Sequence, residues 1–456
     1  MEKSSIIKRL SFIAFVMVVL AAWVAPGYSV DVNWDAQYRV RTIFVDNART
    51  FNDDASADRD SWIDQRFRLG IRLTEAPVSG YVQLQMGDPA GVNGSYTWGT
   101  AAFPNAQPSV FVRQAYLDFP VGPVGLRAGR TYASHGFLGG GLFENIADRI
   151  IVSYKISDEL SGSFIHPKVR EGSGAGIDQT TGTNDSDRNA YNLGVTWKPA
   201  GRSYDAAARI YYNRDAAQAF NAAGTTGATV PGNWDAFWLA AQSNVKLNPV
   251  NIYVSAAFLT GSSEPTVGND IDLTGYAAHI DANIAPGPFK VGLVAGIGSG
   301  DDDASDDSLD TFFAPGGASY IQSHIYFQSG ENNYSQSFIN TANLNLQNGS
   351  NSTLSNTTWA GLYGDYMATP DLTLGARIAT FMKTDELTRN AAGAAVKTDD
   401  SIGNEIDLTL NYMIHKNLSL LAFAAWFMPD DGITGGGAAT DDNVAAYYAR
   451  LQWEIK

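Results

Sequence analysis

The chain has 456 residues, of which 45% are hydrophobic, 12% aromatic and only 17% charged; it has no cysteine and a formal net charge of -16. The lack of cysteine excludes disulfide scaffolds, thiolate metal sites and cysteine nucleophiles. The negative charge argues against nucleic-acid binding, which needs a basic surface. The aromatic content argues against disorder.

The first 29 residues have the pattern of a secretory signal peptide. Lys3, Lys8 and Arg9 form a basic start, the stretch 10–25 is almost entirely apolar, and small residues stand at Gly27 and Ser29. We expect cleavage after Ser29 and export of residues 30–456 as a single domain. The alternative, an uncleaved membrane anchor, is disfavoured because the apolar run is short for a span of about 20 residues.

From residue 30 onward the chain is a series of short stretches in which apolar and polar residues alternate. In the last of them, Tyr447, Leu451 and Trp453 alternate with Tyr448, Arg450 and Gln452. The stretches 63–73 and 405–414 have the same period of two. Because successive side chains of a β-strand point to opposite faces, each stretch predicts a strand with one apolar and one polar face.

Two kinds of connection separate these stretches and take turns along the chain. Short turns rich in Pro, Gly, Asn and Asp are expected at 75–77, 120–123, 157–159, 199–201, 248–249, 286–288, 369–371 and 415–417. Long polar segments are expected at 46–60, 87–109, 133–147, 167–187, 214–233, 260–270, 299–357, 383–403 and 429–443. Eight short and nine long connections predict eighteen strands.

An even number of strands, short turns on one side and long loops on the other are typical of outer-membrane β-barrels. We therefore predict an all-β, transmembrane antiparallel barrel of about eighteen strands in the bacterial outer membrane. A hairpin at 320–328 would raise the count by two. The competing fold is a secreted β-helix or string of sandwiches, which would not explain the alternating connections. Aromatic residues near the short turns, expected in an interfacial girdle, are Phe119, Trp197, Tyr366, Tyr412 and Trp453.

Polar residues within barrel strands are expected to face the lumen. By alternation, the inward arginines are Arg39, Arg41, Arg66, Arg68, Arg72, Arg127, Arg209, Arg377 and Arg450. The direction of Arg113 and Arg130 is not fixed by the pattern. Guanidinium groups stay ionised and bind carboxylate or phosphate in bidentate fashion, so one hypothesis is a lumen that favours anions. The other is that the arginines pair with lumenal Asp64, Asp118, Glu405 and Asp407 and brace the wall.

The segment near 133–147 differs from the other long connections. It is rich in glycine but also contains apolar residues, which are unusual in a solvated loop; the residues expected to act at a constriction are Phe137, Leu138, Leu142, Phe143 and Glu144. Glycine permits a tight backbone path. We expect this segment to fold into the barrel and narrow it, with an external loop as the alternative.

Motifs for catalysis or resident cofactors are not apparent. The five histidines have no metal-ligand spacing, and no GxSxG sequence is present. The acidic cluster at 301–310 departs from a calcium loop, because Asp306 stands where glycine is needed. We expect no enzyme, no cofactor and no dedicated metal site.

The RQAYLDF segment (113–119), the LRAGR segment (126–130) and the glycine-rich loop resemble those of bacterial outer-membrane porins. Among these the chain is most similar to the alginate-export-type and related eighteen-stranded barrels. The resemblance implies a water-filled channel, and we expect passive diffusion of small hydrophilic solutes with modest anion preference. The alternatives are a substrate-selective or export channel for acidic saccharides and a barrel that sheathes a partner protein. Expected partners are outer-membrane lipid, lipopolysaccharide and the barrel assembly machinery; monomer and homo-oligomer are both compatible with the sequence.

Overall fold

The structure is a computed structural model. It describes residues 30–47, 59–87, 96–97, 109–137, 140–141, 143–170, 188–215, 232–266, 268–301, 306–314, 319–320, 355–385, 387–389, 395–397, 399–430 and 442–456. The expected signal peptide, 1–29, lies outside these residues. Among the described residues, no helix is long and apolar enough to cross a membrane.

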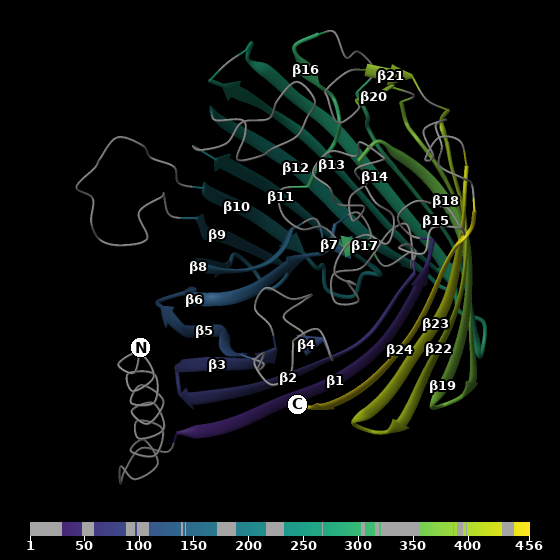
Figure 1. The fold of residues 1–456 in the computed structure, drawn as a ribbon. Coiled ribbons are helices and arrows are strands. Elements are labelled where there is room, and N and C mark those ends of the chain that lie inside the picture. Colours follow the sequence, from purple (N-terminus) through teal and green to yellow (C-terminus); the bar gives the residue numbers. More distant parts are fainter. Residues whose placement is uncertain are drawn as a thin grey trace, which may run out of the picture.

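Eighteen antiparallel strands form one closed barrel (Figure 1). In chain order they are β1 (Asp31–Asp46), β2 (Asp60–Glu75), β3 (Val78–Gly87), β5 (Ser109–Val121), β6 (Val124–His135), β8 (Phe143–Lys155), β9 (Leu160–Arg170), β10 (Arg188–Trp197), β11 (Tyr204–Asp215), β12 (Gly232–Leu247), β13 (Val250–Pro265), β14 (Ile271–Ile284), β15 (Phe289–Gly298), β18 (Thr357–Thr369), β19 (Leu372–Met382), β22 (Ser401–His415), β23 (Leu418–Pro429) and β24 (Val444–Ile455). Each pairs with the next, and β1 pairs with β24, which closes the ring.

Six shorter strands lie in the long connections. They are β4 (Tyr96–Thr97), β7 (Gly140–Gly141), β16 (Ser308–Leu309), β17 (Ser319–Tyr320), β20 (Leu387–Arg389) and β21 (Ala395–Lys397). β4 extends the barrel sheet beside β2, β16 runs parallel to β14, and β7 pairs with β17. The strand count and the order of short and long connections predicted from the sequence are confirmed. The hairpin considered at 320–328 lies outside the described residues except for Tyr320.

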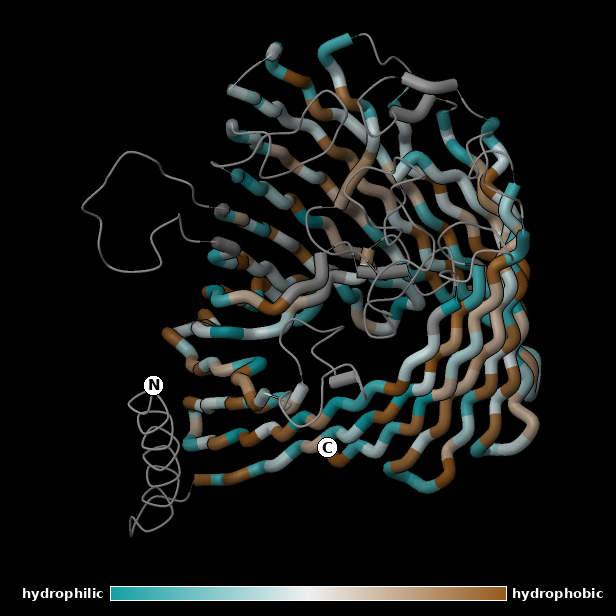
Figure 2. Tube along the Cα trace, in the orientation of Figure 1, coloured by the Kyte–Doolittle hydropathy of each residue, from teal (hydrophilic) through white to brown (hydrophobic). Residues whose placement is uncertain are grey.

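Alternation along the strands gives the barrel two different faces, visible as alternating colours in Figure 2. On β1, Trp34 and Phe44 are exposed on the outer face, whereas Arg39 and Arg41 are completely buried on the inner face. Outward aromatic residues gather near the short turns, as predicted: Trp197, Tyr366, Tyr412 and Trp453 are 37–41% exposed. An apolar outer face bounded by aromatic rings suits contact with lipid.

A charge on the outer face in the middle of a strand tests this assignment. Leu239 on β12 faces outward and is 56% exposed. Leu239→Arg should destabilise the refolded barrel by about 2–4 kcal/mol, because an arginine at the bilayer midplane loses its hydration. Gln242→Arg on the same strand, whose side chain alternates to the inner face, should cost much less. Urea unfolding of both variants in lipid vesicles measures the difference; equal losses would contradict the assignment.

Candidate functional site

Four of the predicted arginines form a buried patch on the inner face of β1 and β2. Arg39, Arg41 and Arg66 are at most 1% exposed and Arg68 is 8% exposed. Neutral amides hold two of them: Arg66 donates to Gln37 (2.6 Å), and Arg68 donates to Gln85 (2.7 Å). Arg41 is held by a carboxylate, since its Nε donates to Asp64 Oδ1 at 2.8 Å. These guanidinium groups are therefore fixed in the wall and shielded from open water.

Arg72 and Arg127, nearer the short turns, are about one-third exposed. Arg127 binds Asp118 in bidentate fashion, with distances of 2.6 and 3.0 Å, and its guanidinium lies 4.2 Å from the ring centroid of Tyr116. Arg72 donates to the Tyr116 hydroxyl (3.1 Å) and lies 5.0 Å from the ring centroid of Tyr81. Stacking on aromatic rings orients a guanidinium without neutralising it. This pair thus presents oriented positive charge to the lumen.

The pairing of β5 and β6 with their neighbouring strands gives the direction of Arg113 and Arg130. Gln83 faces Gln114 but Leu84 faces Val112, so Arg113 is the extra residue of a β-bulge. It is 9% exposed on the inner face and donates to Gln83 at 2.8 Å. Arg130 alternates to the outer face and forms an ion pair with Asp148 at 3.4 Å. A bulge shifts the alternation by one residue, which is why a period of two could not assign Arg113. β6 pairs with β8 without a register shift, so Arg130 follows regular alternation.

The remaining predicted arginines lie on other parts of the inner wall. Arg209 on β11 donates to Asn192 (3.2 Å) and Ser163 (3.3 Å). Arg377 on β19 stands opposite Asp407 in the sheet register, and Arg450 on β24 stands opposite Arg41. All of the predicted arginines therefore alternate to the inner face. Arg149 on β8 is a buried inward arginine that the sequence analysis did not single out.

The two hypotheses for the arginines both describe part of the wall. Asp64 and Asp118 are bound by arginine, as the bracing hypothesis expects. The buried carboxylates Glu405 and Asp407 lie on β22, where Asp407 stands opposite Arg377 of β19. Arg66, Arg68 and Arg113 each donate to a glutamine side chain. The described inner face of β1 to β6 carries more arginine than aspartate and glutamate side chains, so its net charge is positive.

The segment near 133–147 enters the barrel. Phe137 is 1% exposed and belongs to the main buried cluster, and the carbonyl oxygen of Gly136 accepts a hydrogen bond from Tyr253 on β13 at 3.1 Å. β7 of this segment pairs with β17 from the connection between β15 and β18, and Figure 1 shows the two strands within the outline of the barrel. Leu138 and Leu142 lie outside the described residues. Phe143 and Glu144 begin β8, but their side chains are not described.

A second inward segment, 306–314, was not foreseen. It lies on the inner face of β12 to β14, where Trp238 Nε1 donates to the carbonyl oxygen of Phe313 at 2.7 Å and the Phe313 ring packs edge-on against Trp238. A Cβ atom on Gly275 would lie only 2.8 Å from the Phe312 Cα. The glycine therefore permits the close approach of this segment to the wall. The acidic residues around it had suggested an external loop.

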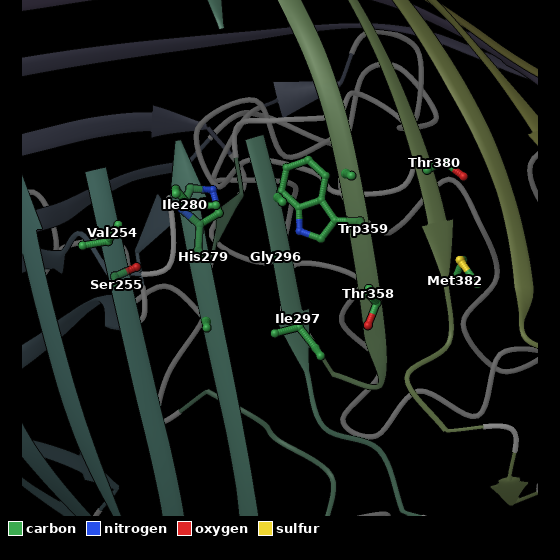
Figure 3. Close-up of a pocket in the computed structure, with 13 residues that line it drawn as sticks. Val254, Ser255, His279, Ile280, Gly296, Ile297, Thr358, Trp359, Thr380 and Met382 are labelled. Carbon is green, nitrogen blue, oxygen red and sulfur yellow. The ribbon is translucent and has the colours of Figure 1, made fainter. Parts of the chain in front are cut away.

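A cavity of about 570 Å³ adjoins β13, β14, β15, β18 and β19 (Figure 3). Gly296 on β15 lies between His279 and Trp359, whose ring centroids are 6.1 Å apart. Most of the other side chains around it are apolar or small, among them Val254, Ile280, Ile297 and Met382. Such a lining offers little to a hydrophilic solute, so the arginine-bearing wall is the better candidate site. Within the described residues, no group of three or more metal-ligating side chains occurs.

Lys383 is a buried cation just beyond the end of β19, on the side of the long connections. Its backbone N–H donates to the carbonyl oxygen of Asp400 at 2.7 Å. Burial lowers the pKa of Lys383 to about 8, and the nearby carboxylates Asp399 and Asp400 act in the opposite direction. This rim of the barrel therefore loses a positive charge at mildly alkaline pH.

No family model matches the chain, and no curated protein matches it. Solved structures do. Outer membrane protein OpdK from Pseudomonas aeruginosa matches with a TM-score of 0.54 and 9% identity, over 93% of this chain and 99% of its own. OccK9 (OpdG) from the same organism matches with a TM-score of 0.55 and 14% sequence identity, and OccK2 (OpdF) with a TM-score of 0.55 and 11% identity. Each match covers 93% of this chain and 98% of the other chain. The chain therefore has the fold of bacterial outer-membrane porins.

Proposed function

We propose that the protein is an outer-membrane channel through which small hydrophilic solutes diffuse, with a modest preference for anions. The observation that carries the proposal is the division between an apolar outer face and an inner wall with arginines from β1, β2, β5, β6 and β8. A pore wall with fixed positive charge favours anions, because it stabilises them as they give up water. The role is transport and not catalysis.

The arginines do not contribute equally to this proposal. Arg39, Arg41 and Arg66 are buried and act through their field on the lumen, whereas Arg72 and Arg127 have water-facing surface. Phe137 and the segment 306–314 both reduce the free cross-section on the side of β12 to β14. We infer that solutes pass between these inward segments and the wall of β1 to β6, where the charge is concentrated.

A channel selective for acidic saccharides is the second candidate. It is favoured by a solved structure with this fold, OccK2 (OpdF) in complex with glucuronate, an acidic sugar. Another such structure, OpdK, holds vanillate, an aromatic carboxylate. Arg72 and Arg127, oriented by Tyr81 and Tyr116, would suit a carboxylate on a ring, because guanidinium binds carboxylate and the aromatic faces can contact the ring. Lipopolysaccharide, the barrel assembly machinery and further copies of the chain remain predicted partners.

Recording single channels in a planar bilayer under a tenfold KCl gradient tests the proposal. We expect stable conductance with a reversal potential that favours chloride. Glucuronate added to one side should reduce the chloride current if the second candidate holds, and leave it unchanged if the channel is general. Open channels that prefer potassium would contradict the proposed role of the arginine wall.

A further inference from the structure

Three cations lie on the outer face of the barrel. Arg130 is 46% exposed, Arg214 is exposed and Lys168 is half-buried. Among the arginines whose side chains are described within barrel strands, all except Arg130 and Arg214 alternate to the inner face. A charge facing hydrocarbon is costly, and the cost falls toward zero at the membrane interface. The outward cations should therefore mark the level of lipid headgroups.

These cations belong to one continuous row across six neighbouring strands, β6, β8, β9, β10, β11 and β12. Opposite each other in the sheet register are Arg130 and Asp148, Asp148 and Lys168, Lys168 and Asn189, Asn189 and Arg214, and Arg214 and Asp235. We call these six residues the outer charged row. It contains three cations and two carboxylates, so it keeps a net positive charge.

A second row, of aromatic rings, lies one outward position closer to the short turns. His166 stacks on Tyr191 with ring centroids 4.6 Å apart, Tyr191 stacks on Tyr212 at 6.1 Å, and Tyr212 lies 4.5 Å from Phe237. Aromatic residues are typical of the boundary between headgroups and acyl chains. The order along the strands, charge and then aromatic rings, is the order of phosphate and acyl chain in a lipid.

The depth of the row agrees with this order. On β10, Trp197 belongs to the girdle at the short turns and Asn189 to the outer charged row, a difference of eight positions. At about 3.3 Å per residue and a strand tilt near 40°, the two levels are roughly 20 Å apart along the barrel axis. An outer-membrane barrel has an apolar band of roughly 25 Å. The row thus lies at the boundary on the side of the long loops.

We propose that the outer charged row binds the phosphate groups of outer-leaflet glycolipid. Arg130, Lys168 and Arg214 lie on every second strand, so they are about 10 Å apart across the sheet. Each cation can bind a phosphate by charge-assisted hydrogen bonds, and Asn189 adds amide donors between two of them. The aromatic row below contacts the first methylene groups of the acyl chains. This proposal rests on the outer-membrane location proposed above and adds the site at which lipid is bound.

The test uses the full-length refolded barrel in non-ionic detergent, titrated calorimetrically with lipid A that carries two phosphates and with the same lipid after dephosphorylation. The parent protein should bind the phosphorylated lipid more tightly. Lys168→Gln combined with Arg214→Gln should weaken that binding roughly thirtyfold, because each of the two cations near an anionic lipid surface contributes about 1 kcal/mol. Binding of the dephosphorylated lipid should be the same for parent and variant.

The matched control is Arg202→Gln combined with Lys246→Gln, which removes the same charge from exposed positions at the short-turn end. The control should bind the phosphorylated lipid as tightly as the parent does. If it loses as much affinity as the row variant, then binding depends only on the net charge of the protein. Unchanged binding by the row variant would also overturn the proposal. If that variant does not fold into a heat-modifiable barrel, the parent protein alone tests the proposal. High salt should then weaken its binding of the phosphorylated lipid and leave its binding of the dephosphorylated lipid unchanged; equal effects on both lipids would overturn the proposal. Conductance of the same preparations separates loss of lipid binding from failure of the channel.

Discussion

Replacing Arg72 and Arg127 together with glutamine should turn the channel from anion-preferring to cation-preferring. Both guanidinium groups are about one-third exposed, and both lie within 4 Å of Asp118, at 3.6 and 2.6 Å. Removing them takes away two positive charges and frees one negative charge at the same place. Asp35, which accepts a hydrogen bond from Tyr81 at 2.9 Å, adds a second carboxylate nearby. The local field therefore changes sign and is not merely weakened.

The measurement is the reversal potential of single channels under a tenfold KCl gradient. We expect it to move from the chloride side to the potassium side, and the shift should shrink in high salt because mobile ions screen the wall. Arg202→Gln, at an exposed short turn, is the control and should leave the potential unchanged. A triple variant that also carries Asp118→Asn should return toward neutrality. A double variant that still prefers chloride would assign selectivity to the buried arginines instead.

Gly275→Ala should release the segment 306–314 from the wall and raise the conductance. The added methyl group would lie 2.8 Å from Phe312 Cα and 2.9 Å from its nitrogen, so backbone has to move. Overpacking of this kind typically costs about 1–3 kcal/mol, and we expect the detached segment to leave the lumen through the end of the barrel that carries the long connections. The pairing of β14 with β13 and β15 uses the main chain and should persist. The barrel should still fold, and its lumen should be wider.

Gly364→Ala on β18 is the matched control, because a Cβ there would meet its nearest neighbour at an ordinary 3.7 Å. Trp238→Ala offers an independent route to the same state, since it removes the donor to Phe313 and the ring beneath the segment. That substitution should cost about 3–5 kcal/mol in urea unfolding, as for other buried aromatic residues. Unchanged single-channel conductance in both Gly275→Ala and Trp238→Ala would show that the segment does not narrow the channel.

Most of the barrel could be predicted from the sequence because its determinants are local. Alternation of apolar and polar residues is a property of the extended backbone itself, and turns of Pro, Gly and Asn fix where one strand ends and the next begins. The direction of Arg39, Arg66 and Arg450 followed from the same alternation. These features need no knowledge of which strands are neighbours beyond the order of the chain.

The same alternation did not give the direction of Arg113 on β5 or of Arg130 on β6. The direction of Arg113 depends on a bulge between β3 and β5, and Gly129 has a positive φ of 129° where a Cβ would collide with the Ala115 carbonyl oxygen. A bulge arises from the pairing of two strands and shifts the alternation in only one of them. Periodicity within a single strand does not contain this information.

The sequence by itself determined the strands, their order and the inner position of most arginines. Only the tertiary structure decided which arginines are buried and which face water, because exposure depends on contacts between residues far apart in the sequence, such as Arg41 with Asp64 and Arg68 with Gln85. The outer charged row likewise exists only in the folded barrel, since its members are separated by long connections and are aligned by the register of six strands. Alternation is a local property of the chain, whereas burial and lateral alignment arise from contacts between residues far apart in the sequence.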